Sequence, residues 1–276
     1  MLRWLLWRDS KIIWVQHLSV SGPLRSAKGM RRMRLSFEIW LMRRLIQHAD
    51  AVVAVSISVA DDMKRLISPD LSVQVIYNPV ISSDFEQRCR ERVDWPWPDK
   101  EVSTVVFVGR LAPVKRLDLL LQAFSRCIQV MPIRLLVLGY GSQEEVAREL
   151  SRELRLGDAC RFLGYCENPL PWIRCADLLV LCSDSEGFGL VLVEAMGCGT
   201  QVVSTDCPDG PSEVLNDGQF GRLVPMGNAE ALASAIQASL TSPVARQDDL
   251  KKRAAEFSVE RAVAKYVELL VAVERA

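Results

Sequence analysis

The chain has 276 residues, of which 49% are hydrophobic and 25% are charged, a composition that indicates a soluble globular protein. This length accommodates one large domain or two small ones. Lys and Arg total 34, as do Asp and Glu, so the zero net charge excludes any argument for nucleic-acid binding from the overall charge.

The charge is unevenly distributed, because the first 50 residues carry ten basic groups against three acidic ones. A basic segment that also bears tryptophans suits an anionic membrane surface or an anionic substrate. No apolar run is long enough to cross a bilayer, and no signal-peptide cleavage site is present. We therefore expect a cytoplasmic protein with peripheral contact to the anionic inner face of a membrane.

The eight cysteines are scattered along the chain, and none forms a C-x-x-C pair. Several of them lie inside apolar runs. We therefore expect buried cytosolic thiols in preference to a metal site or to disulfides.

Short runs of Val, Ile and Leu alternate with helical patterns in the first part of the chain. Strands are predicted at 11–16, 51–55 and 73–77, and helices at 30–48 and 58–67. The helix at 30–48 is basic and amphipathic, so its apolar side suits either a protein core or a membrane surface. The stretch 80–100 follows Asn78-Pro79, is polar and contains WPWP, which predicts a linker.

A second series of strands and helices begins after this stretch. Strands are predicted at 104–108, 134–138, 161–163, 178–182 and 201–204, and helices at 116–130, 144–156, 171–175, 190–196, 229–240 and 259–274. Strands that alternate with helices form parallel sheets that are covered on both faces. We therefore predict an α/β protein with two Rossmann-like domains, residues 1–79 and residues 101–276, joined by the linker and ending in closing helices.

Ligands of open α/β sheets bind beyond the carboxyl ends of the strands, so the loops at these ends are the candidate site. Residues 184–189 form such a loop directly before the helix at 190–196. Its glycines let the backbone approach a ligand closely, and the helix N-terminus offers free N–H groups to a diphosphate. The carboxylates of Glu186 and Glu194 can accept hydrogen bonds from a vicinal diol, such as that of ribose or a hexose.

Cations stand at the same edge of the predicted sheet. Arg110 follows Gly109 at the end of the first strand of the second series, and Lys115 lies five residues further on. Both can offset the charge of a diphosphate and stabilise it as a leaving group. A plainer reading stays open, in which these two are solvated loop cations and Glu186 is a charge favoured by a helix N-terminus.

Glu186 and Glu194 form an E-x7-E pattern, and the G-R-x4-K pattern of Gly109, Arg110 and Lys115 lies upstream of it. With EGFGLVLVEAMGCG around the glutamates, the chain from about Ser103 to its end resembles the retaining glycosyltransferases of family 4. Residues 206–213 resemble members that build bacterial surface polysaccharides. The resemblance implies a GT-B fold and an enzyme that transfers a hexose or N-acetylhexosamine, with retention, from a nucleotide-diphosphate sugar to a glycan or lipid-linked acceptor.

The resemblance also implies roles for individual residues. Glu194 would bind the ribose hydroxyls and Glu186 the hydroxyls of the donor sugar, while Arg110 and Lys115 would bind the diphosphate. Backbone contacts to the donor would come from Gly109, Gly187, Phe188, Gly189, Leu190 and Val191. The base of a UDP- or GDP-sugar would lie near residues 162–165. No metal or other cofactor and no protein nucleophile is expected, because the departing diphosphate helps to deprotonate the acceptor.

The segment before Asn78 resembles only part of the N-terminal domain of that family. His17 falls where members place an active-site histidine, although a strand-end histidine is the alternative reading. The opening strand–helix units with their Gly-rich loop are absent, so we predict an incomplete N-terminal domain.

Two alternatives to an active transferase stay open. The chain is a truncated, non-catalytic remnant that binds a nucleotide sugar, or it is one subunit of a split enzyme whose partner supplies the missing N-terminal half. A dinucleotide-dependent oxidoreductase is disfavoured, because no G-x-G-x-x-G follows a predicted strand.

Overall fold

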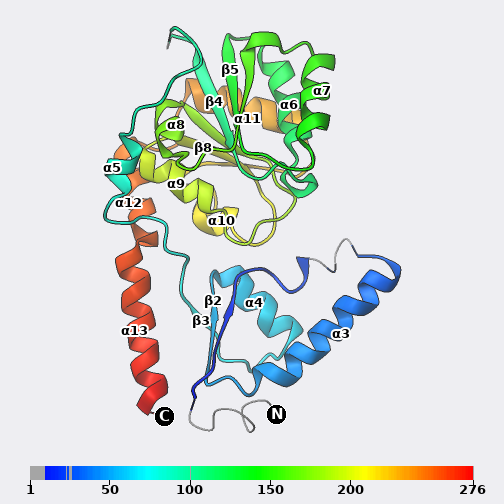
Figure 1. Cartoon of the computed structure of the whole chain (residues 1–276), viewed down its shortest axis with the longest axis vertical. Coiled ribbons are helices and arrows are strands. Elements are labelled where there is room, and N and C mark those ends of the chain that lie inside the picture. Colours follow the sequence, from blue (N-terminus) through cyan, green and yellow to red (C-terminus); the bar gives the residue numbers. More distant parts are fainter. Residues whose placement is uncertain (1–9, 23, 25–26, 100, 276) are drawn as a thin grey trace. The chain divides into compact units, whose positions relative to one another are not determined.

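The structure is a computed structural model that describes residues 10–22, 24, 27–99 and 101–275 (Figure 1). The tryptophan-bearing start of the chain, with Arg3 and Arg8, and also Arg25 lie outside the described residues, so the membrane contact expected from them is not addressed. The chain divides into two compact units. The smaller unit contains the residues up to Asn78 together with those from Glu260 onward, and the larger unit spans Pro79–Val259.

The smaller unit is a parallel sheet of three strands in the order β1-β2-β3. Successive residues of a strand face opposite sides of a sheet. Val52 and Ala54 therefore pack against α4 and the end of α3, whereas Val53 packs against α13. The elements of this unit are β1 (Ile13–Gln16), α3 (Gly29–Ile46), β2 (Ala51–Ala54), α4 (Ile57–Leu66), β3 (Gln74–Val75) and α13 (Val259–Arg275).

The larger unit is built on a parallel sheet of six strands in the order β6-β5-β4-β7-β8-β9. The strands are β4 (Ser103–Val108), β5 (Ile133–Leu138), β6 (Cys160–Gly164), β7 (Leu178–Leu181), β8 (Gln201–Thr205) and β9 (Arg222–Val224). The α-helices are α5 (Phe85–Cys89), α6 (Leu117–Cys127), α7 (Glu144–Glu153), α8 (Leu170–Cys175), α9 (Leu190–Cys198), α10 (Pro211–Val214), α11 (Ala229–Thr241) and α12 (Gln247–Ala254), and the 3-10 turns are η1 (Pro113–Lys115), η2 (Gly157–Ala159) and η3 (Ala255–Phe257).

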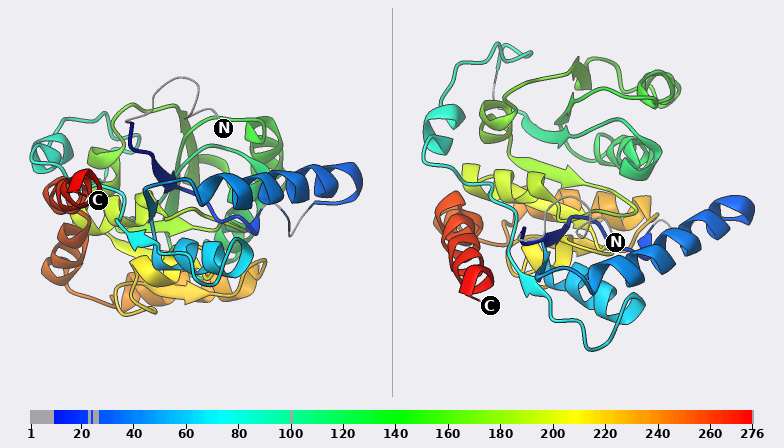
Figure 2. Two further views of the ribbon diagram at one scale, coloured as in Figure 1. Left: turned by 90° about the horizontal axis from the view of Figure 1, so that it is seen from below. Right: turned by 60° about the horizontal axis from the view of Figure 1, so that its bottom comes forward.

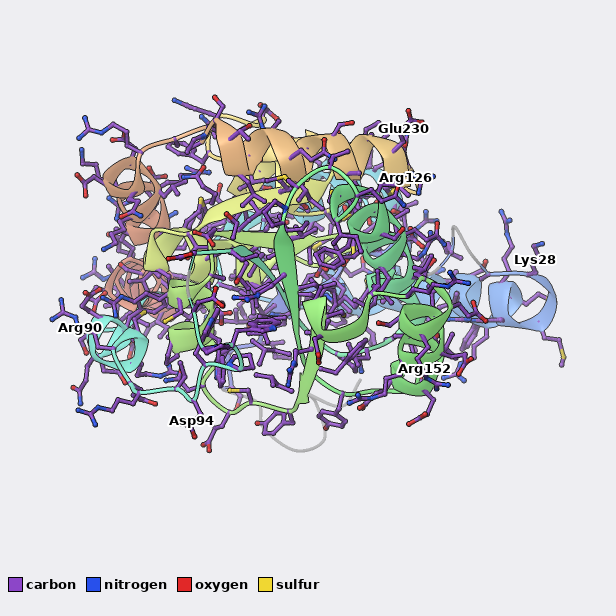
Figure 3. The ribbon with its side chains drawn as sticks, turned by 90° about the horizontal axis from the view of Figure 1, so that it is seen from above. Lys28, Arg90, Asp94, Arg126, Arg152 and Glu230 are labelled. Atoms are coloured by element: carbon purple, nitrogen blue, oxygen red, sulfur yellow. The ribbon has the colours of Figure 1, made fainter. Side chains whose placement is uncertain are left out.

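Helices cover both faces of this six-stranded sheet (Figure 2). Phe107 and Leu135 point into a core with α6, α7 and α11, and the alternate residues Val106 and Leu136 are equally buried on the opposite side. Seen from above, α5 with Arg90 lies at one end of the unit, and Arg126 and Arg152 mark α6 and α7 at the other end (Figure 3). The predicted α/β class with two parallel sheets, the N-terminal one small, is confirmed.

Residues 80–99 of the predicted linker are packed within the larger unit. The ring of Trp97 is buried, and its Nε1–H donates to the carbonyl of Asp158 at 3.0 Å. Trp95 stacks on Trp172 with their ring centroids 6.0 Å apart. The sequence predicts a linker here because the stretch is polar and Pro-rich, whereas the buried ring of Trp97 and the stacked ring of Trp95 tie it to the sheet domain.

The last predicted helix was expected to close the second domain, and the structure places it elsewhere. The structure puts α13 on the sheet of the smaller unit, where Leu269 and Val273 are buried together with Val53 and Ile76. No helix among the described residues is long and apolar enough to span a membrane.

Candidate functional site

The strand order of the larger unit reverses between β4 and β7, which are neighbours in the sheet although two strands separate them in the chain. Loops diverge at such a point and leave a crevice beyond the carboxyl ends of the strands. The loop after β4 carries Lys115, and the loop after β7 carries Glu186. The two sequence motifs thus meet at the topological switch point.

An ion pair joins these two loops. Nζ of Lys115 lies 2.6 Å from Oε1 of Glu186, whose side chain is only 9% exposed. The hydroxyl of Ser183 donates to the same carboxylate oxygen, and the amide of Asp184 donates to the carbonyl of Val114 at 2.8 Å. The lysine and the glutamate of the two motifs therefore form one buried unit before any ligand is considered.

Arg116 strengthens this junction. It stands in the left-handed region with φ of 50°, and its guanidinium bonds the carboxylates of Asp118 and Asp184. Hydrogen bonding to Asp118, together with the charge of Asp184, raises the pKa of Arg116 above its ordinary value. Arg116 was not predicted as a site residue, because its only signal in the sequence is a second cation directly after Lys115.

The N-terminus of α9 directly follows the loop that carries Glu186. Gly189 precedes the helix with φ of 84°, and no side chain caps it. The first N–H groups of a helix have no carbonyl before them, so those of Leu190 and Val191 are available to an anion. Phe188 anchors the loop, because its buried ring packs edge-to-face on Phe257 at 5.4 Å.

The loop that follows β8 lies against this segment. A Cβ on Gly210 would come within 2.4 Å of the carbonyl oxygen of Phe188, so only glycine allows the approach. Burial, with the nearby charge of Glu186, raises the pKa of Cys207 to about 12. Asp209 is buried with φ of 73°, and its Oδ2 has no hydrogen-bond partner among the described residues.

Glu194 lies in the interior of α9 and is largely buried. Desolvation raises the pKa of its carboxyl, and the charge of Arg88 on α5 opposes the shift. No hydrogen bond to its carboxylate is found among the described residues. A carboxylate in this state is a strong acceptor for ligand hydroxyls.

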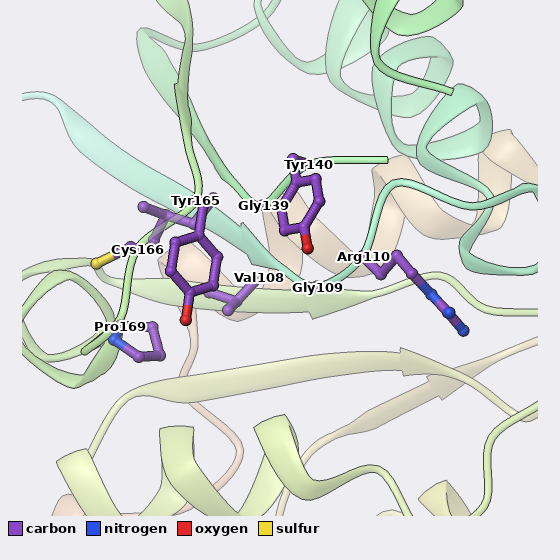
Figure 4. Close-up of a pocket in the computed structure, with 9 residues that line it drawn as sticks. Val108, Gly109, Arg110, Gly139, Tyr140, Tyr165, Cys166 and Pro169 are labelled. Carbon is purple, nitrogen blue, oxygen red and sulfur yellow. The ribbon is translucent and has the colours of Figure 1, made fainter. Parts of the chain in front are cut away.

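A pocket of about 290 Å³ lies beside these loops, and Gly109, Arg110, Tyr140 and Tyr165 line it (Figure 4). The two tyrosine rings meet edge-to-face at 5.7 Å, and both are well exposed, at 62% and 71%. Figure 4 shows Arg110 extending away from both rings. The base was expected near residues 162–165, which include Tyr165, whereas no role was predicted for Tyr140, an aromatic residue between two glycines.

The loops under this pocket approach each other backbone to backbone. Gly139 has φ of 136°, and a Cβ on it would lie 1.9 Å from the carbonyl oxygen of Gly109. The amide of Leu111 donates to the carbonyl of Tyr140 at 2.9 Å. Gly139 is therefore required for the close packing that forms the pocket floor.

The remaining predicted residue, His17, belongs to the smaller unit, where it is exposed directly after β1. The other predicted site residues lie in the larger unit, on the loops after β4 and β7 or on α9, and residues 162–165, expected near the base, lie in and directly after β6. Among the described residues, no group of three or more His, Cys, Asp and Glu side chains is placed to hold a metal ion.

Two family models match the chain. The model described as glycosyl transferases group 1 matches residues 90–257, and the model described as glycosyltransferase family 4 matches residues 1–83. N-acetyl-alpha-D-glucosaminyl L-malate synthase of Bacillus anthracis is 30% identical over 71% of this chain and 52% of its own length. Phosphatidyl-myo-inositol mannosyltransferase of Mycobacterium leprae is 38% identical over 52% of this chain and 39% of its own length.

Solved structures share the fold. Sucrose-phosphate synthase from Thermosynechococcus elongatus superposes with a TM-score of 0.77 at 24% identity, over 98% of this chain and 70% of that one. Anabaena HepE in complex with UDP gives a TM-score of 0.78 at 22% identity, over 95% of this chain and 72% of that one. The chain spans about half, or less, of the length of the curated relatives named above.

Proposed function

We propose, from the premise that this chain belongs to the glycosyl transferases group 1 family, that it binds a nucleotide-diphosphate sugar and transfers its hexose or N-acetylhexosamine with retention. The observation that carries the proposal is the meeting of Lys115, Glu186 and the uncapped start of α9 at one switch point. Glu194 on the same helix adds a second carboxylate acceptor. Cations, helix amides and two carboxylates are the groups that a diphosphate with sugars on both ends requires.

Each group has a part in this proposal. The base stacks in the pocket beside Tyr140 and Tyr165. The volume of this pocket, about 290 Å³, suits a base rather than a whole sugar nucleotide. Glu194 accepts hydrogen bonds from the ribose hydroxyls. The amides of Leu190 and Val191 bind the diphosphate.

Release of the diphosphate is the step that the cations assist. Lys115 exchanges part of its contact with Glu186 for a phosphate oxygen, and the freed carboxylate accepts hydrogen bonds from the donor sugar. Arg110, exposed at the mouth of the pocket, stabilises the departing diphosphate. No metal or protein nucleophile takes part in this proposal. His17 is proposed as an acceptor-side contact.

Titration calorimetry of the full chain with UDP, GDP and their glucose and N-acetylglucosamine derivatives tests donor binding. Loss of the ribose contacts in Glu194→Ala is expected to weaken binding about 10- to 100-fold. Glu145→Gln, an exposed glutamate on α7, is the matched control and keeps the affinity of the unaltered chain. If the chain binds none of these nucleotides, the proposal is wrong.

The acceptor is proposed to be a glycan or lipid-linked molecule at an anionic membrane surface. The relative from Mycobacterium leprae is named for a lipid acceptor. In this chain α3 exposes Met33, Phe37 and Trp40 among several arginines. This pairing of apolar and basic side chains fits the cytoplasmic face of a membrane. In a flotation assay, we expect the chain to move with vesicles that contain anionic lipid. If the chain is absent from the lipid fraction at every salt concentration, the proposed membrane contact is wrong.

A second candidate is a non-catalytic sugar-nucleotide binder, or one subunit of a split enzyme. It is favoured by the position of β1, which ends the smaller sheet and has only β2 as a neighbour among the described strands. An edge strand of this kind offers unpaired N–H and C=O groups to a further strand. Donor turnover by the purified chain alone, measured as release of UDP or GDP, separates the candidates, because the second predicts binding without turnover.

A further inference from the structure

A pair of thiols lies between α5 and α9, outside the proposed donor contacts. Sγ of Cys89, the last residue of α5, is 3.4 Å from Sγ of Cys198, the last residue of α9. The two residues are 109 positions apart in sequence. Sequence spacing predicts isolated buried thiols, whereas the fold brings these two into contact.

Packing holds the pair in place. A Cβ on Gly197 would come within 2.8 Å of Ile81 and of the ring of Phe85, so glycine is what allows α5 to lie this close to α9. Phe85, Cys89 and Leu170 form a buried cluster against which Cys198 packs. Arg90, which follows Cys89, lies on the outer side of the helix (Figure 3). Disulfide formation requires the two sulfurs to approach by roughly 1.4 Å, from 3.4 Å to about 2.05 Å.

One residue of the pair faces a groove, and the two thiols differ in pKa. Cys198 and Arg174 line this groove of about 690 Å³, whereas Cys89 is buried behind them. The hydrogen bond with Cys198 lowers the pKa of Cys89, helped by the charges of Arg174 and Lys251 and opposed by burial and Glu86. The pKa of Cys198 is raised in turn by the bond to Cys89, by burial and by the charge of Glu194. These opposite shifts of pKa make Cys89 the more acidic thiol of the pair.

We propose that Cys89 and Cys198 are a reversible disulfide-forming site whose co-substrate is a two-electron oxidant of the peroxide class. The thiolate attacks a peroxide oxygen, so that an S–O bond forms, the O–O bond breaks and hydroxide leaves. The second sulfur loses its proton and attacks the resulting sulfenic sulfur, forming the S–S bond and expelling hydroxide. In sum, two thiols and one hydrogen peroxide give one disulfide and two waters, with each sulfur giving up one electron.

The crosslink has a structural consequence. Cys198 lies one turn after Glu194 on α9, and Ile81–Cys89 begins shortly after the boundary between the two units at Asn78 and Pro79. Oxidation therefore fastens this segment to the helix that carries the proposed ribose contact. The inference goes beyond the proposed transferase function and does not depend on it.

The experiment treats the full purified chain with hydrogen peroxide and follows intact mass, free thiols and peptide crosslinks. We expect a loss of about 2 Da, loss of two of the eight thiols, and one crosslinked peptide pair containing Cys89 and Cys198, all reversed by dithiothreitol. Hydrogen exchange in residues 81–89 is expected to slow after oxidation. Addition of oxygen without a crosslink, or a crosslink between other cysteines, overturns the proposal.

Matched variants sharpen the result. Cys198→Ser and Cys89→Ser are each expected to abolish the crosslink, and Cys198→Ser is the safer choice because its side chain is less buried. Cys175→Ser, which removes another thiol of the same groove, is the control and keeps the crosslink. Persistence of the mass loss in both single variants contradicts the site. None of these readouts uses nucleotide binding, so a failure of the donor proposal remains distinguishable.

Discussion

Lys115 and Glu186 neutralise each other in a crevice that is proposed to receive an anionic ligand. The pair is largely buried, and Ser183 completes the hydrogen bonding of the carboxylate. Buried charges are tolerated in this way only when each has its partner. The same contact that holds two loops together thus keeps a lysine and a carboxylate in position for a ligand that binds both.

The first prediction concerns this ion pair. Lys115→Ala leaves Glu186 without its cation and is expected to lower the free energy of unfolding of the larger unit by about 2 kcal/mol. Glu186→Gln removes the charge, so the double variant is expected to be more stable than the sum of the single effects predicts. Urea denaturation of the four proteins measures the coupling, and strictly additive effects would contradict a direct pair.

The second prediction concerns Glu194. Its pKa is raised by burial, so the ionised side chain destabilises the folded chain at neutral pH. Glu194→Gln is therefore expected to raise the melting temperature at pH 7 while weakening nucleotide binding. As the pH falls through the raised pKa, the carboxyl of the unaltered chain becomes protonated and the difference in melting temperature narrows. Scanning fluorimetry across the acid range measures it, and a gap that widens toward low pH contradicts the assignment.

At the scale of single residues, sequence spacing predicted candidate site residues where they belong to one local motif. G-R-x4-K and E-x7-E contain Lys115 and Glu186, which the structure joins in an ion pair. Arg116 and Asp184 were not predicted, because their pairing depends on two loops that lie 68 residues apart. The exposed ring of Tyr140 was missed for the same reason, since its partner Tyr165 follows a different strand.

Among the elements, the loops after β4 and β5 depend most strictly on glycine. Gly139 has a positive φ, and the carbonyl oxygen of Gly109 occupies the place where a Cβ of residue 139 would lie. No side chain fits between two backbones at that separation. The pocket beside Tyr140 therefore exists because these loops can touch.

The third prediction follows from this contact. Gly139→Ala is expected to destabilise the larger unit by about 3 kcal/mol and to weaken nucleotide binding, because the loops must separate. Ser142→Ala, an exposed change in the same loop, is expected to alter stability by less than about 0.5 kcal/mol. Chemical denaturation and calorimetry measure both variants. Equal effects of the two changes would show that the close approach is not required.

Element types were predictable from periodicity, whereas the place of some segments was not. The strands β4, β5 and β7 are near-continuous apolar runs and follow directly from the sequence. The stretch 80–100 reads as a linker because Pro and polar residues dominate it. Its fixed position comes from Trp95, Trp97 and the ion pair of Asp99 with Arg134, which are long-range contacts.

At the scale of the whole chain, two cores are joined by two connections. The chain leaves the smaller unit at Asn78 and returns to it at Glu260 as α13. Periodicity predicted this helix but not its unit, because an apolar stripe does not specify which sheet it covers. The smaller unit has three strands among its described residues, and α13 covers one face of their sheet.

The last prediction tests this arrangement with two adjacent leucines of α13. Leu269 is 8% exposed and packs against Val53 and Ile76, whereas its neighbour Leu270 is 53% exposed. Leu269→Ala removes buried apolar surface and is expected to cost the smaller unit about 2–3 kcal/mol, while Leu270→Ala costs less than about 1 kcal/mol. Because each unit has its own core, calorimetry is expected to resolve two transitions, of which Leu269→Ala lowers one. A uniform shift of the whole unfolding profile would instead show that α13 stabilises both units together.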